Sequence, residues 1–75
     1  MIGNSSSWFY AQFSIVGGKA GGFGVRSVLV LASDVKTAES LVRSRFVSDG
    51  ARVLVLMCQG ATIGQRNSVK LDRIK

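Results

Sequence analysis

Two apolar segments flank a glycine-rich stretch in the first half of the chain. In residues 8–16, a wholly apolar side alternates with a mixed polar and apolar side at period two. This alternation, with the aromatic and β-branched residues of the stretch, predicts a strand. Residues 17–24 include five glycines, which oppose regular structure because glycine loses the most conformational entropy on ordering. Residues 25–32 form the second predicted strand. The short loop between the two segments favours an antiparallel hairpin.

The stretch at residues 35–47 has the period of an α-helix. Its apolar residues fall on one stripe, whose members are Val35, Ala38, Leu41, Val42 and Phe46. Ser33 and Asp34 come directly before this stretch and are favourable N-cap residues. Gly50 follows it and suits the left-handed conformation in which helices commonly end.

Two more strands are predicted after the helix. Residues 51–58 are a nearly continuous apolar run, and residues 69–74 alternate weakly. The second pattern is typical of an edge strand, where the charge of Lys70 discourages unwanted pairing. Thr62 and Ile63 are expected to begin a short return before a polar turn.

The predicted elements follow the order β-β-α-β-β. This order indicates an α+β fold in which one helix packs on an antiparallel sheet of four strands, or five. Residues 1–75 are expected to form a single small basic domain, with residues 1–7 frayed.

One helix cannot cover both faces of such a sheet. Alternation places Phe9, Phe13 and Ile15 on one side of the first strand, and Trp8 and Tyr10 on the other. The second and third strands are apolar on both sides, so a large apolar patch is expected on the face away from the helix. Three uses of that face are open: contact between two copies in a homodimer, docking of another protein, and stacking of unpaired bases.

The net charge of the chain is +6, and the cations are dispersed along it. Such an excess in a small domain is typical of nucleic-acid binding, although it also fits an acidic protein partner or a surface that keeps the protein soluble. We expect contact with RNA or single-stranded DNA through a basic, aromatic sheet face and the glycine-rich loop, with Arg43 and Arg66 on the phosphate backbone. The candidate binding residues are Trp8, Tyr10, Lys19, Arg26, Arg43, Arg66 and Lys70.

Several residue types are scarce. The chain has no histidine, one cysteine and four scattered acids, which oppose a zinc site and leave few groups for acid–base chemistry. No enzyme activity, metal or cofactor is therefore expected. The longest apolar run has six residues, too few to span a membrane. The sequence shows no secretory signal, and Cys58 has no second cysteine with which to form a disulfide. Both observations favour the cytoplasm.

The β-β-α-β-β order and basic surface are similar to those of several small phage-encoded inhibitors, including some anti-CRISPR proteins. This resemblance of size and layout implies an alternative function. The protein would then be a phage or mobile-element protein that docks on a host protein complex.

Overall fold

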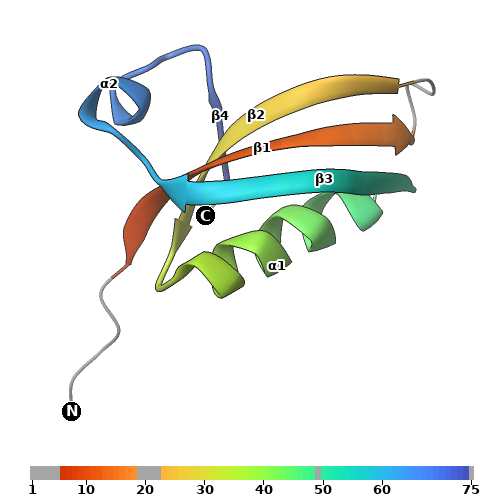
Figure 1. Ribbon diagram of the computed structural model, residues 1–75, viewed down its shortest axis with the longest axis horizontal. Helices are drawn as coiled ribbons and strands as arrows, with labels where there is room; N and C mark the ends of the chain where they lie inside the picture. The colour runs from red at the N-terminus through yellow and green to blue at the C-terminus, as the bar shows by residue number, and fades with distance from the viewer. Residues whose placement is uncertain (1–5, 19–22, 49, 75) are drawn as a thin grey trace.

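The computed structural model describes residues 6–18, 23–48 and 50–74 (Figure 1). Four strands form one sheet in the order β3-β1-β2-β4, and helix α1 covers one of its faces. The elements are β1 (Ser7–Gly17), β2 (Phe23–Ala32), α1 (Val35–Val47), β3 (Ala51–Gly60), α2 (Ile63–Arg66) and β4 (Asp72–Ile74). Ser7 already belongs to β1, whereas residues 1–5 of the predicted frayed end lie outside the described residues.

The predicted hairpin and helix are confirmed. Strands β1 and β2 pair antiparallel along their whole length, and α1 occupies the predicted residues. The carboxylate of Asp34 caps α1 by accepting a hydrogen bond from the Thr37 backbone N–H at 2.7 Å, and this bond lowers the pKa of Asp34. Gly50 has a φ of 80° and donates its N–H to the Val47 carbonyl at 2.9 Å, which closes the helix as expected.

The main core lies between α1 and the sheet. The predicted stripe supplies Ala38, Val42 and Phe46 to it, and the first strand supplies Ala11 and Phe13. The rings of Phe13 and Phe46 lie with their centroids 5.1 Å apart and their planes tilted by 53°, a favourable aromatic arrangement. Alternation in β1 was therefore sufficient to predict which of its sides faces the helix.

The prediction of an antiparallel sheet is wrong, because β4 pairs parallel to β2. Strands β3 and β4 lie at opposite edges, so the chain crosses the sheet between them and no tight hairpin can join them. The expected return strand and polar turn are replaced by α2. A capping box begins this short helix, in which the Thr62 hydroxyl accepts from the Gln65 N–H and the Gln65 side chain accepts from the Thr62 N–H.

A bulge divides β3. The pairing between β1 and β3 shifts register between Gln12 and Ser14, and Val55 at that point has a φ of 51°. Val53 packs into the core before the bulge, and Leu56 packs against it afterwards. The bulge thus changes which alternate residues of β3 face α1, while Leu54, Val55 and Met57 stay exposed.

The backbone of Val55 is strained, because a β-branched residue is strongly disfavoured at positive φ. Its side chain is 78% exposed, so little packing is lost when it is replaced. We expect Val55→Asn to raise the free energy of unfolding by about 0.5–1 kcal/mol, since asparagine tolerates this conformation. The same change at exposed Met57, which lacks positive φ, is the matched control in urea unfolding. If Val55→Asn does not raise the free energy of unfolding relative to Met57→Asn, the backbone of Val55 is not strained.

Candidate nucleic-acid interface

The sheet face away from α1, here called the open face, is covered at one end. Leu29 is 0% exposed, although it lies outside the cluster beneath α1. It pairs with Arg73 of β4, and Arg73 hydrogen-bonds to the segment that contains α2. The C-terminal segment, residues 61–74, therefore covers this end. The apolar patch expected on the face away from the helix therefore does not extend over this end.

The other end of the open face is exposed and apolar. The apolar residues at this end include Val25 and Leu54, which pair with Ser14 from the two neighbouring strands, and Met57, which pairs with Gln12. Val25 and Met57 are 64% and 65% exposed. A homodimer contact would lie at this end, and it stays a prediction.

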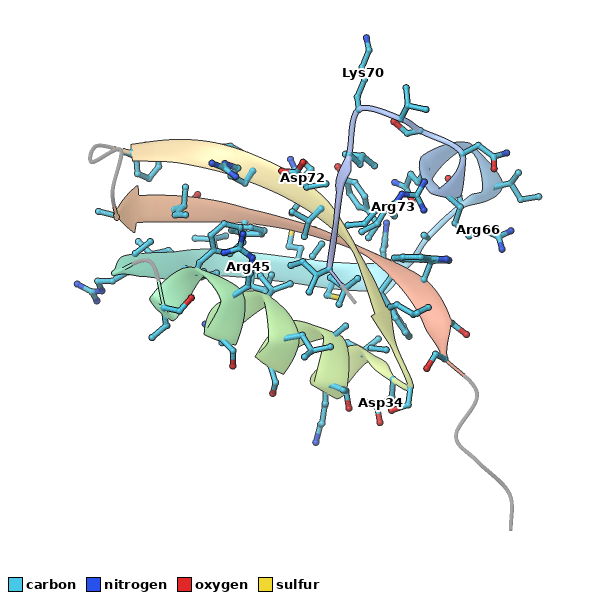
Figure 2. The ribbon with its side chains drawn as sticks, turned by 180° about the vertical axis from the view of Figure 1, so that it is seen from behind. Asp34, Arg45, Arg66, Lys70, Asp72 and Arg73 are labelled. Atoms are coloured by element: carbon cyan, nitrogen blue, oxygen red, sulfur yellow. The ribbon has the colours of Figure 1, made fainter. Side chains whose placement is uncertain are left out.

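At the covered end, the guanidinium of Arg73 stacks on the ring of Trp8. Its Cζ atom lies 5.1 Å from the ring centroid. One terminal nitrogen of Arg73 donates to the Arg66 carbonyl at 2.7 Å and to the Ser68 carbonyl at 3.4 Å. Figure 2 shows Arg73 and Arg66 on the same side of β4, near α2. These contacts hold the C-terminal segment against β1 and fix one face of the indole.

A pocket of about 440 Å³ lies beside Trp8. Its walls come from the start of β1, the end of β3 and the end of α2, namely Ser6, Ser7, Trp8, Gly60, Ala61 and Arg66. Arg73, which stacks on Trp8, is not among the residues that line this pocket. The Ala61 N–H donates to the Trp8 carbonyl at 3.0 Å and fixes the pocket wall to β1. Trp8 is half-buried and Arg66 is exposed, so an aromatic and a cationic residue border the same pocket.

Tyr10 lies two residues further along β1, on the same face. Its hydroxyl donates to the Ser27 hydroxyl oxygen at 3.0 Å, which holds the ring in place. It lines a separate small hollow of about 80 Å³ together with Gln12 and Gln59. The two predicted aromatic residues therefore share a face, as expected from the alternation, but each borders its own cavity.

The predicted cations do not gather around the aromatic pair. Arg26 pairs with Phe13 and lies on the α1 side, where its Cζ atom is 5.6 Å from the Phe46 centroid. Arg43 is exposed on α1, which covers that same face. Lys70 is exposed in the C-terminal segment and extends away from the body (Figure 2). Lys19 lies outside the described residues. Of the predicted cations that the structure describes, Arg66 alone lines the Trp8 pocket.

Sequence reasoning did not select Arg73 or Arg45. Arg73 reaches the open face because β4 pairs with β2 in a parallel register, which a hairpin arrangement could not reveal. Arg45 lies with its Cζ atom 5.9 Å from the centroid of Phe46, one position before it on α1. The surplus of cations in the last ten residues was the available sign of a basic C-terminal surface.

Other chemistry has little support among the described residues. No three of their His, Cys, Asp and Glu side chains lie close enough to hold a metal ion, and neither helix is long and apolar enough to cross a membrane. Burial raises the pKa of the Cys58 thiol, as does the charge of Glu39, so the thiolate is disfavoured. Compared with known proteins, the chain matches no family model, no curated protein and no solved structure.

Proposed function

We propose that this protein binds single-stranded nucleic acid, RNA or DNA, at the pocket beside Trp8. The observation that carries the proposal is a half-buried indole, fixed by Arg73, which lines a cavity together with the exposed cation of Arg66. An unpaired base stacks on the indole within the cavity, and Arg66 contacts the adjacent phosphate. A base within a duplex is already stacked on its neighbours, which is why the proposal is limited to single strands.

Each residue has a separate role in this proposal. Stacking on Trp8 supplies about 1–3 kcal/mol for one base. Arg66 and Lys70 supply positive charge to the phosphate backbone from the two ends of the connection between α2 and β4. Arg73 is a positioning residue, because one of its terminal nitrogens donates to the carbonyls of Arg66 and Ser68 while its guanidinium stacks on Trp8. The proposal requires binding alone, without catalysis, and places the protein in the cytoplasm.

The test uses Trp8, which is the single tryptophan of the chain and therefore reports on the pocket without a label. Adding a ten-nucleotide oligo(U) or oligo(dT) at low salt is expected to quench its fluorescence. Trp8→Ala, followed by anisotropy of a labelled oligonucleotide, is expected to weaken binding by about 5- to 150-fold, which is the loss of one stacked base. With two phosphates contacted, the logarithm of the affinity falls against the logarithm of salt with a slope of about −1.4.

A matched pair of charge reversals distinguishes binding at the Trp8 pocket from general electrostatic attraction to a protein with net charge +6. Arg66→Glu and Arg43→Glu change the net charge equally, but only Arg66 lines the Trp8 pocket. We expect Arg66→Glu to weaken binding at least tenfold more than Arg43→Glu. Equal losses, or an unquenched Trp8 with both oligonucleotides at low salt, would refute binding at this pocket.

A further inference from the structure

The outer edge of β2 is open over half of its length. Strand β4 pairs with β2 only at Val28, Leu29 and Val30. Among the described residues, no strand pairs with this edge at residues 23–27, and Figure 1 shows β2 continuing well beyond β4. An open edge presents backbone N–H and C=O groups that can pair with another strand. This edge segment lies in line with β4 and is five residues long, or about 17 Å.

A pocket of about 290 Å³ adjoins this open edge on the α1 side of the sheet. Its apolar lining residues are Val28, Phe46 and Ile74, and its charged lining residues are the three cations Arg26, Arg45 and Arg73 and the anion Asp72. Phe46 is held between the elements because it packs on Phe13 in the core. Val28 and Phe46 are 1% and 7% exposed, so the accessible apolar surface of the pocket, beside the unpaired strand backbone, is mainly that of half-buried Ile74.

Two guanidinium groups border this pocket at fixed positions. The Cζ atoms of Arg26 and Arg45 lie 5.6 Å and 5.9 Å from the Phe46 centroid. Stacking on a ring restrains a guanidinium and directs its N–H donors outward, toward the planar carboxylate groups that arginine binds best. Within the described part of the chain, Arg26 has no hydrogen-bond or ion-pair partner besides its stack on Phe46. Asp72 pairs with Val28, two residues from Arg26, so it lies at the same end of an added strand as Arg26.

We propose that this edge binds an acidic peptide in an extended conformation, as an added strand beside residues 23–27 of β2. Its backbone pairs with β2, one apolar side chain enters the Phe46 pocket, and an acidic side chain contacts Arg26. Side chains of a strand alternate between faces, so the recognised pattern is an acidic and an apolar residue two positions apart.

A peptide fits this edge better than a nucleic acid does. A phosphodiester backbone has no N–H donors for the strand carbonyls of β2. Phe46 is 7% exposed beneath the two guanidinium groups, so it offers no ring face for a base. The proposal therefore differs in place and in ligand from oligonucleotide binding at Trp8.

The probe is a fluorescein-labelled pentapeptide of sequence Glu-Thr-Val-Thr-Glu, followed by anisotropy at low salt. Two N-methylated forms, one for each alternating set of amides, test the backbone pairing, because only one set points toward β2 in an added strand. We expect one form to lose binding and the other to keep it. Equal binding by the two N-methylated forms would overturn the added strand. Binding of a Lys-Thr-Val-Thr-Lys peptide as tight as that of the glutamate peptide would overturn the preference for acidic side chains.

Side-chain recognition is tested with Arg26→Gln. The matched control is Arg52→Gln, which makes the same change of charge at an exposed residue of β3. Arg26→Gln is expected to weaken the peptide about tenfold while Arg52→Gln has little effect, and circular dichroism checks that both variants fold. Peptide binding is read from the labelled peptide and oligonucleotide binding from the labelled oligonucleotide on the same variants, so failure here and failure of nucleic-acid binding are distinguishable. An oligonucleotide that responds to Arg26→Gln while the peptide does not bind would assign the edge to nucleic acid and overturn the proposal.

Discussion

Phe46→Ala is expected to lower the free energy of unfolding by about 3–5 kcal/mol. The ring is buried in the core, packs against Phe13 at 5.1 Å and carries both guanidinium groups of the edge pocket. A small domain of this size has on the order of 4–11 kcal/mol of stability in total, so much of the chain should be unfolded in this variant at 37 °C. Urea unfolding followed by circular dichroism measures the loss.

The control for this change is Phe46→Leu, which keeps most of the volume but removes the aromatic face. It should cost less than about 1.5 kcal/mol, since swaps that conserve volume are the best tolerated. The folded leucine variant also loses the stacking surface of Arg26. An alanine variant as stable as the leucine variant would show that Phe46 does not hold the helix to the sheet.

Leu29→Ala is expected to cost about 2–4 kcal/mol, because it opens a cavity beneath the C-terminal segment. Val25 lies on the same face of the same strand but is 64% exposed, and Val25→Ala should cost less than about 1 kcal/mol. The comparison measures how much of the open face the C-terminal segment protects. Equal small costs at both positions, read from urea midpoints, would mean that this end of the face is uncovered in solution.

Short-range sequence features predicted the helix and the hairpin correctly. The end of α1 is set by Gly50 and its start by Asp34, and both act within a few residues. Alternation in β1 correctly placed Trp8 and Tyr10 away from the helix, because Phe13 and the apolar residues at every second position from it form the opposite side. Such features are encoded locally, and the rest of the fold adds little to them.

Long-range features escaped prediction for physical reasons. Both sides of β2 are apolar, so its sequence cannot tell whether Val28 or Leu29 faces the helix, and the place of Arg26 depends on that choice. The bulge at Val55 likewise leaves no mark in an all-apolar run. The parallel pairing of β4 depends on a crossover between opposite edges of the sheet, although the capping-box pair Thr62 and Gln65 was visible in the sequence.

The attachment of β4 determines how binding at Trp8 affects the motions of the protein. Three residue pairs hold β4 to the sheet, whereas β1 has a partner strand on both sides. The C-terminal segment is therefore the first unit to open by local unfolding, while the hairpin stays closed. The Trp8 pocket has walls on both units, from β1 and from Arg66 of α2. We therefore expect the ligand proposed for that pocket to join the two units and to lower the rate of amide exchange in the C-terminal segment, including backbone groups that the ligand does not touch.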